Sequence, residues 1–232
     1  MDILGISCYF HDAAAVLLRD GQVIAAAEEE RFSRRKHDYR FPTAAIQFCL
    51  TRGGIRAEEL DYVAFFEKPF IKFERLLFSI LQTFPRSRRV FQESMMSWLT
   101  DKLWVKNLLH AKLGVSLDKI LFSEHHLSHA ASAFLCSPFD EAAILTVDGV
   151  GEWATATYGV GKGTDITLQH EIAFPHSLGL LYSAFTAFLG FEVNEGEYKV
   201  MGMAPFGDPK YLDKVYKLIS VERDGSFQLN MD

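Results

Sequence analysis

The chain has 232 residues, 49% of them hydrophobic, and a formal net charge of -6. This composition is typical of a soluble globular protein with one large domain or two small ones. The negative charge argues against general nucleic-acid binding, which needs a basic face. The longest apolar stretch, residues 178–191, is broken by polar residues and is too short to span a bilayer, so we expect no membrane role.

The cysteine content and the N-terminus bear on the compartment. The three cysteines, Cys8, Cys49 and Cys136, form no CxxC pair, which argues against a disulfide framework or a zinc-thiolate site and favours a reducing compartment. The N-terminus lacks the basic region and long apolar run of a signal peptide. We therefore expect a cytoplasmic protein.

The first part of the chain predicts an antiparallel meander. Apolar runs predict strands at 3–6, 13–18 and 23–27. Asp20-Gly21 is typical of the two-residue turn that joins the second strand to the third. The short loop between the first two strands carries His11 and Asp12.

The remaining chain predicts alternating helices and strands. Helices are expected at 43–53, as two or three helices within 70–113 split at Pro85, from His125 onward, at 177–189 and at 209–219. Ser177 is a plausible N-cap of the helix at 177–189. Strands are expected at 60–66, 119–122, 142–147, 154–160 and 166–174. The segment 195–207 is rich in glycine, and we expect it to be mobile.

This order of elements predicts a mixed α/β fold with flanking helices. It resembles the actin-like, sugar-kinase-like ATPase (ribonuclease H-like) architecture, in which two related halves each open with a strand hairpin whose turn contacts phosphate. That resemblance implies a first half at 1–140, with a helical insertion near 70–113, and the start of a second half at 141–232.

The charged run 28–37 admits two interpretations. A charge-balanced run of this kind is usually a solvated loop. The alternative is a basic edge, formed by Arg34, Arg35 and Lys36, that holds an anionic substrate group.

His125, His129 and Asp148 form a candidate metal site. The two histidines are four residues apart at the start of an apolar helical pattern, so both imidazoles lie on one helix face. This spacing also occurs by chance among structural histidines, but Asp148, at the end of a buried strand, strengthens the metal interpretation. Two imidazoles and a carboxylate suit iron(II), manganese or zinc. His126 lies about 100° further round the helix. We interpret it either as a residue that contacts the metal ligands from behind or as a structural residue.

The loop Asp148-Gly149-Val150-Gly151 is also a candidate phosphate loop. Such a loop is often an ordinary turn, but after a buried strand its glycines let backbone amides approach an anion closely. Asp148 is therefore assigned to the metal, to the nucleotide or to both.

His11 and Asp12 form the third candidate site. A polar pair in a turn is usually exposed and inert. If the two halves are related, however, this turn faces the same cleft as Asp148. His11, whose ordinary pKa lies near neutrality, then acts as a general base toward a hydroxyl.

Six sequence blocks, taken together, resemble one enzyme family. They are L-G-I-S…F-H-D-A-A-A-V-L, A-E-E-E-R-F-S-R-R-K-H, H-H-L-S-H-A-A-S-A-F, V-D-G-V-G-E, S-L-G-L-L-Y and Y-K-V-M-G-M-A-P-F-G. In this order they resemble the O-carbamoyltransferases of the NodU/CmcH type. The resemblance spans nearly the whole chain.

The resemblance implies a reaction and its partners. In this family a C-terminal YrdC-like domain makes carbamoyl adenylate from carbamoyl phosphate and ATP. The N-terminal domain, which is similar to the subunit that transfers threonylcarbamoyl to tRNA, passes the carbamoyl group to a hydroxyl of a sugar, antibiotic or nodulation-factor acceptor. For this chain it implies a small-molecule acceptor and no nucleic acid, and it leaves the oligomeric state open.

The resemblance also implies roles for single residues. His125, His129 and Asp148 match the iron-site positions, and His11 matches the proposed base. Nucleotide or carbamoyl-adenylate contacts are implied at Lys36, Asp148, Gly149, Gly151 and Gly179. Acceptor contacts are implied at Tyr9, Asp12, Glu197 and Lys199.

The chain departs from the family pattern in its length. Family members continue well beyond Asp232 to a further aspartate ligand and the YrdC-like domain, so we expect a fragment with an incomplete metal site and adenylate pocket. Two other hypotheses remain open. One is a sugar kinase or other actin-like ATPase, in which Asp148 serves Mg-ATP and the histidines are structural. The other is a non-catalytic binding module.

Overall fold

The structure of the protein is a computed structural model that describes residues 1–100 and 102–231, apart from the side chains of residues 90, 97 and 100. The chain forms two compact units, Met1–His125 and His126–Asp232. Each unit has its own sheet, and each is described by itself below.

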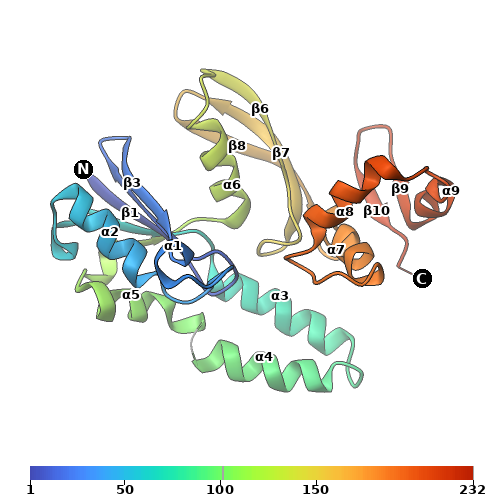
Figure 1. The fold of residues 1–232 in the computed structure, drawn as a ribbon, viewed down its shortest axis with the longest axis horizontal. Coiled ribbons are helices and arrows are strands. Elements are labelled where there is room, and N and C mark those ends of the chain that lie inside the picture. The colour runs from blue at the N-terminus through green and yellow to red at the C-terminus, as the bar shows by residue number, and fades with distance from the viewer. Residues whose placement is uncertain (101, 232) are drawn as a thin grey trace. The chain divides into compact units, whose positions relative to one another are not determined.

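Unit 1 is built on a five-stranded mixed sheet with the strand order β3-β2-β1-β4-β5 (Figure 1). Its strands are β1 (Asp2–Ser7), β2 (Ala14–Arg19), β3 (Gln22–Glu28), β4 (Tyr62–Phe65) and β5 (Ile120–Phe122). The first three form an antiparallel meander, and β4 and β5 run parallel to β1. The predicted meander and its turn are confirmed, because Asp20 and Gly21 both have positive φ angles, of 50° and 79°.

The core of unit 1 lies on one face of this sheet. Leu4 alternates with half-buried neighbours along β1 and lies opposite Leu17 and Val63 on the adjacent strands, and all three side chains are fully buried. Helices α2 (Thr43–Gly53) and α5 (Val105–Leu113) supply the apolar residues packed against them. α2 ends where predicted, because Gly54 takes the left-handed conformation that closes a helix.

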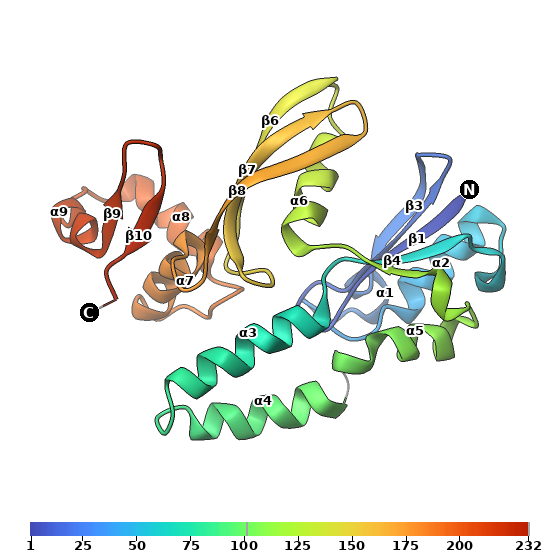
Figure 2. The ribbon, with the colours of Figure 1, turned by 180° about the vertical axis from the view of Figure 1, so that it is seen from behind.

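The other helices of unit 1 precede or follow β4. They are α1 (Glu30–Ser33), α3 (Pro69–Gln82), α4 (Arg88–Thr100) and the 3₁₀ turns η1 (Ala57–Glu59), η2 (Lys102–Trp104) and η3 (Leu117–Lys119). Helices α3 and α4 lie side by side as a hairpin (Figures 1 and 2). The prediction of two or three helices within 70–113 is thus confirmed.

Unit 2 contains a second antiparallel meander, in the order β6-β7-β8 (Figure 2). The elements are α6 (His125–Phe134), whose first residue ends unit 1, and strands β6 (Glu141–Val147), β7 (Ala154–Lys162) and β8 (Asp165–Ala173). Phe134 of α6 packs on Ile144 of β6. The other face of the sheet carries apolar side chains that are exposed within this chain: Leu145, Val147 and Tyr158.

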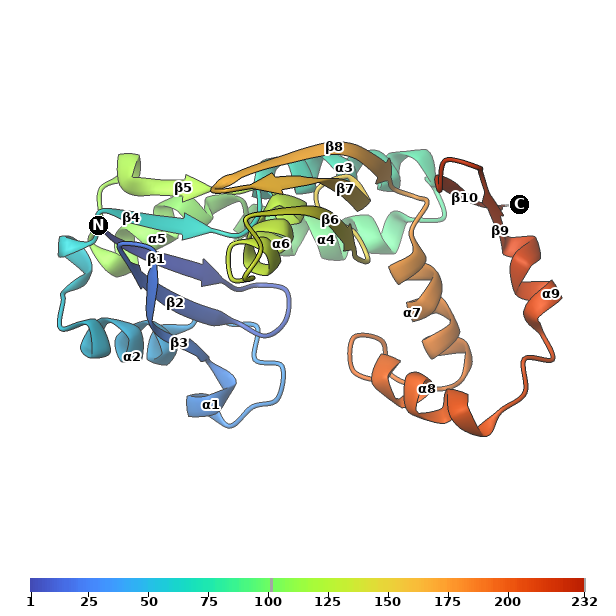
Figure 3. The ribbon, with the colours of Figure 1, turned by 90° about the horizontal axis from the view of Figure 1, so that it is seen from above.

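The last part of unit 2 differs from the prediction over residues 209–219. Its elements are α7 (Leu178–Phe188), α8 (Glu197–Met203), η4 (Ala204–Phe206), α9 (Leu212–Val215), η5 (Tyr216–Leu218), β9 (Ile219–Val221) and β10 (Phe227–Leu229). The glycine-rich segment 195–207 is largely helical, and α8 lies beside α7 (Figure 3). The helix expected over 209–219 is reduced to α9 and η5, and residue 219 already belongs to β9. β9 pairs with β10 across a turn in which Gly225 has a φ of 86°.

The fold class expected from the sequence, a mixed α/β fold with flanking helices, is confirmed. Its two three-stranded meanders lie in different units, and parallel strands extend the first. Among the described residues, no helix is both long enough and apolar enough to cross a membrane.

Candidate functional site

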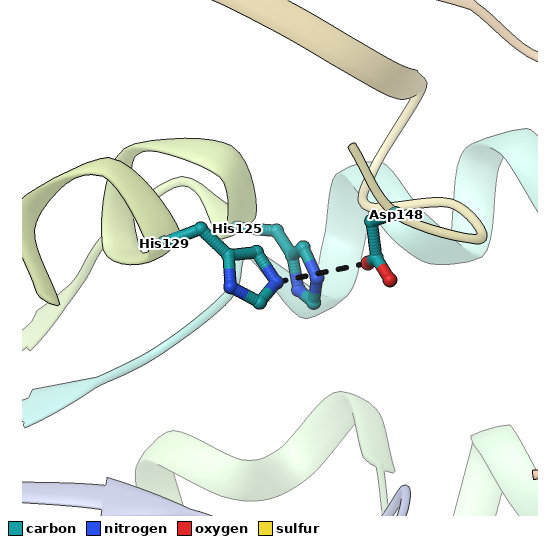
Figure 4. Close-up of side chains that lie close together, drawn as sticks. All are labelled: His125, His129 and Asp148. Carbon is teal, nitrogen blue, oxygen red and sulfur yellow. Dashed lines mark ion pairs between the residues drawn. The ribbon is translucent and has the colours of Figure 1, made fainter. Parts of the chain in front are cut away.

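Helix α6 places the two candidate histidine ligands on one face. His125 is its first residue and His129 lies one turn later, so the helix itself brings both imidazoles to the same side (Figure 4). Their surroundings differ: the side chain of His125 is 8% exposed and that of His129 is 52% exposed. One candidate ligand is therefore fixed inside the protein, and the other is open to solvent.

Asp148 completes the candidate ligand group from the loop after β6. Its Oδ2 lies 3.7 Å from Nε2 of His129. One ligand atom from each of His125, His129 and Asp148 can be chosen so that all lie within 4.8 Å of one another. Atoms bound to one transition-metal ion at about 2.0–2.2 Å are about 3–4 Å apart. The three side chains thus fit a shared ion after small adjustments, and the two-imidazole, one-carboxylate donor set suits iron(II), manganese or zinc.

His126 has a structural role. It is 3% exposed, and its Nε2 lies 2.9 Å from the carbonyl oxygen of Ala154, while its Nδ1 lies 2.6 Å from Oγ1 of Thr146. In a neutral imidazole, Nε2–H donates to the carbonyl, so Nδ1 accepts from the threonine hydroxyl. The hydroxyl of Thr157, 2.6 Å away, can then donate to Thr146. These bonds fasten α6 to β6 and β7.

The start of α7 fixes the Asp148 loop. The buried Ser177 caps α7 by accepting a hydrogen bond from the amide of Leu180, and its hydroxyl lies 2.6 Å from the carbonyl oxygen of Gly149. A Cβ on Gly179 would come within 2.5 Å of the carbonyl oxygen of Asp148. Glycine at 179 therefore lets the helix approach the backbone of the candidate ligand closely.

The candidate base His11 lies in the loop between β1 and β2. Its Nδ1 is 2.9 Å from Oδ2 of Asp12, and the other carboxylate oxygen of Asp12 is 2.8 Å from Nδ1 of His37. Burial alone would raise the pKa of Asp12, but the hydrogen bonds with His37 and His11 outweigh it and hold this pKa below its usual value. Asp12 therefore remains charged between the two histidines.

Asp12, Glu30 and His37 form a second group whose potential metal-ligating atoms lie within 4.8 Å. Both carboxylate oxygens of Asp12 already bond to histidines, and Glu30 accepts a hydrogen bond from the backbone amide of His37 at 2.9 Å. These hydrogen bonds account for the close approach without an ion.

The other predicted site residues have the following positions in unit 1 and in the Asp148 loop. Lys36 is exposed in the loop between α1 and α2. Tyr9 precedes His11 and has a positive φ of 71°. The amide of Gly151 donates to the carbonyl oxygen of Ala154, so it forms part of the loop's own turn. A phosphate contact from that amide would require this bond to open.

Glu197 and Lys199 lie on α8. Oε1 of Glu197 accepts hydrogen bonds from the hydroxyl of Ser183 and the amide of Asn194, both at 3.0 Å. Burial would raise the pKa of Glu197, but these bonds and those to nearby backbone amides lower it below its usual value. The ammonium group of Lys199 lies over the rings of Phe191 and Tyr198. Glu197 thus stabilises the turn between α7 and α8.

Three residues that shape this region were not among the candidates from the sequence: His37, Glu30 and Glu67. Glu67 lies two residues beyond the end of β4 and is buried beside His125. A carboxylate immediately after an apolar run was the available signal, because buried charges are rare unless they are paired.

Comparison with known proteins identifies a family. The sequence profile described as "Carbamoyltransferase N-terminus" matches residues 2–232. The uncharacterized protein sll1178 of Synechocystis sp. is 54% identical over 99% of this chain and 38% of its own length. Nodulation protein NolNO of Sinorhizobium fredii is 39% identical over 97% of this chain and 32% of its own length. The chain thus spans about a third of the length of these relatives.

Solved structures show weaker likenesses. YeaZ from Pseudomonas aeruginosa aligns with a TM-score of 0.40 and 14% identity, over 75% of this chain and 67% of that protein. The activator of 2-hydroxyisocaproyl-CoA dehydratase from Clostridium difficile, with bound ADPNP, aligns with a TM-score of 0.39 and 12% identity. The alignment covers 90% of this chain and 68% of that protein.

Proposed function

The chain belongs to the carbamoyltransferase family, and its residues 2–232 correspond to the N-terminal region of that family. We propose that it carries the transfer residues of an enzyme that moves a carbamoyl group to a hydroxyl. The match over residues 2–232 carries this proposal. The donor we propose is carbamoyl adenylate, made from carbamoyl phosphate and ATP by a YrdC-like domain of the full-length protein. The acceptor is a small molecule of the sugar, antibiotic or nodulation-factor class.

His11 is the proposed base. With Nδ1–H donating to Asp12, the lone pair of Nε2 is free to take the proton of an acceptor hydroxyl, and the carboxylate stabilises the imidazolium that results. The acceptor oxygen then forms a bond to the carbamoyl carbon. The bond from that carbon to the phosphate oxygen breaks, and AMP leaves with the electron pair. The role of Asp12 is to orient His11, in addition to the acceptor contact inferred from the family.

His125, His129 and Asp148 are the proposed ligands of a divalent transition metal, with iron(II) preferred over manganese and zinc. When bound, such an ion supplies Lewis-acid polarisation to a carbonyl or phosphate oxygen. A buried and an exposed imidazole on one helix allow one ligand to stay fixed while the other adapts.

The remaining proposed contacts follow the family positions. Adenylate contacts are proposed for Lys36, Asp148, Gly149, Gly151 and Gly179, and acceptor contacts for Tyr9, Asp12, Glu197 and Lys199. Lys36 is exposed and cationic, which suits an anionic phosphate. The carboxylate of Glu197 is already bonded to Ser183, so its contribution to acceptor binding includes holding the α7–α8 turn.

The test uses the full-length parent protein. We expect AMP release that depends on carbamoyl phosphate, together with a carbamoylated polyol detected by mass spectrometry. A phosphorylated product would instead support the sugar-kinase alternative, and stable complex formation without nucleotide or metal binding would support a binding module. Absence of carbamoyl-dependent AMP release with every polyol acceptor would refute the proposal.

The metal ligands are tested separately. The double variant His125→Ala, His129→Ala should lose bound transition metal in elemental analysis of the purified chain, while the matched variant His110→Ala on α5 should retain it. Metal content in the double variant equal to that of the wild type would rule out the ligand assignment.

A further inference from the structure

Glu67 is a buried carboxylate just beyond the carboxyl end of β4. Its residue is 7% exposed, and it follows an apolar strand that lies inside the sheet of unit 1. A carboxylate in such a position loses most of its hydration and persists only with close cationic or hydrogen-bonding partners. Its partners therefore indicate its role.

The first partner of Glu67 is Lys72. The ammonium of Lys72 lies 2.5 Å from Oε2 of Glu67, and both side chains are almost fully buried. Lys72 belongs to the first part of α3, only five residues after Glu67. The same ammonium lies over the ring of Phe10 at 4.9 Å. These contacts hold the carboxylate in one position and leave it little freedom to rotate.

The second partner is the candidate metal ligand His125. Its Nδ1 lies 3.6 Å from the same Oε2 of Glu67 that Lys72 contacts, and its side chain is 8% exposed. This distance is slightly longer than a hydrogen bond. A carboxylate that closes to hydrogen-bond distance selects the tautomer with hydrogen on the facing ring nitrogen and leaves the other nitrogen as the electron-pair donor. Metal-ligating histidines commonly have such a carboxylate behind them.

We propose that Glu67, held by Lys72, is a positioning residue that keeps hydrogen on Nδ1 of His125 and presents Nε2 to a divalent transition metal. The inference rests on the proposed metal site but assigns a role to a residue outside the ligand group. It also explains why a buried ion pair is kept here, where an apolar pair of similar volume would commonly be at least as stable.

The test compares Co²⁺ affinity in four forms of the full 232-residue chain. They are the wild type, Glu67→Gln, the double variant Glu67→Gln, Lys72→Met, and Glu124→Gln. The double variant removes both buried charges, so it avoids leaving a buried ammonium unpaired. Glu124→Gln is the matched control, because Glu124 is 56% exposed, pairs with Lys68 and immediately precedes His125 in the chain.

We expect both Glu67 variants to bind Co²⁺ about 10–100-fold more weakly in competition with a chromophoric chelator, the usual range for loss of such a partner. Glu124→Gln should bind as the wild type does. Unchanged Co²⁺ affinity in a folded double variant would overturn the proposal, since a purely structural ion pair would change the melting temperature and leave metal affinity alone.

A second measurement keeps the test decisive if the double variant fails to fold or the wild type binds no metal. The ¹⁵N chemical shifts of His125 in the metal-free protein report which ring nitrogen carries hydrogen. We expect the Nδ1–H form in the wild type and in Glu124→Gln. An Nε2–H form in the wild type would refute the positioning role, whatever the outcome for metal binding. A wild type with the Nδ1–H form but no Co²⁺ binding would contradict the proposed metal site instead.

Discussion

The loops that follow β1 and β6 have the same length, but different side-chain contacts stabilise them. Residues 8–13 connect β1 to β2, and residues 148–153 connect β6 to β7. In the first loop, Asp12 bonds to two histidine side chains, and the amides of Tyr9 and Ala13 donate to carbonyl oxygens of the segment 38–39, so side-chain pairs add to backbone bonds. In the second, backbone bonds and the close approach of Ser177 and Gly179 maintain the shape.

The two loops also differ in their backbone φ angles. Tyr9 and Asp12 in the first loop have positive φ angles of 71° and 46° although neither is glycine. Such conformations are uncommon for residues with a Cβ and concentrate at functional sites. Gly149 in the second loop has no positive φ, and a Cβ there would make an ordinary 3.6 Å contact with Leu180. The glycine-rich loop is thus the less strained of the two.

The largest expected effect comes from crowding the second loop. Gly179→Ala places a Cβ 2.5 Å from the carbonyl oxygen of Asp148, so α7 and the loop must move apart. We expect a loss of about 1–3 kcal/mol in the free energy of unfolding, the range for overpacked sites, together with weaker Co²⁺ binding. Urea denaturation and chelator competition measure the two effects.

Gly202→Ala on α8 is the control for this substitution. A Cβ at position 202 meets no atom within 4 Å. Because glycine inside a helix is less favourable than alanine, this variant should be as stable as the wild type or slightly more stable. Equal stability and Co²⁺ affinity for Gly179→Ala and the wild type would show that the loop is not held by close packing.

An intermediate effect is expected from the cap of α7. Ser177→Ala removes the acceptor for the amide of Leu180 and the hydroxyl near the carbonyl oxygen of Gly149. Loss of a helix cap costs about 0.5–2 kcal/mol. Thermal unfolding should therefore show a lower melting temperature than in Ser132→Ala, where an exposed hydroxyl bonds back to its own helix. Indistinguishable melting of the two variants would argue against anchoring by Ser177.

The smallest stability effect is expected in the first loop and depends on pH. Asp12→Asn removes the charge while keeping a residue type that tolerates positive φ. The lowered pKa of Asp12 means that its ionised form stabilises the fold above its unfolded pKa of about 3.9 and that this contribution is lost as pH falls through the lower folded pKa. The variant should lose about 0.2–1 kcal/mol at pH 7, the range for exposed pairs.

The measurement is the difference in unfolding free energy between the wild type and Asp12→Asn at several pH values. It should keep its full size above about pH 5, where Asp12 is ionised in both states, and should shrink toward zero as the pH falls further, wherever both proteins remain folded. A difference that stays constant with pH would show that the carboxylate charge does not hold the first loop.

The sequence predicted local features better than distant contacts. The strand runs, the Asp20-Gly21 turn and the cap at Ser177 follow from periodicity and side-chain chemistry within a few residues, and all three are confirmed. The pairing of β9 with β10 was missed because a three-residue strand has little periodicity of its own.

The same limit applies to the candidate site. The spacing of His125 and His129 follows from helix geometry, so their common face could be predicted. Glu67 is 58 positions from His125 in the chain, and no local pattern relates them. Likewise, the reason for glycine at 179 is the backbone of Asp148, which only the tertiary structure brings near. The roles of these residues remain predictions.

The bonding of His126 has a consequence for how this region tolerates insertions and deletions. With its imidazole joined to Thr146 and the carbonyl of Ala154, α6 cannot turn about its own axis without breaking both contacts. One residue added between His126 and His129 would swing the later histidine by about 100° while the earlier part of the helix stayed fixed. Chains with such a length change should therefore lose the shared ligand face even if all three histidines are retained.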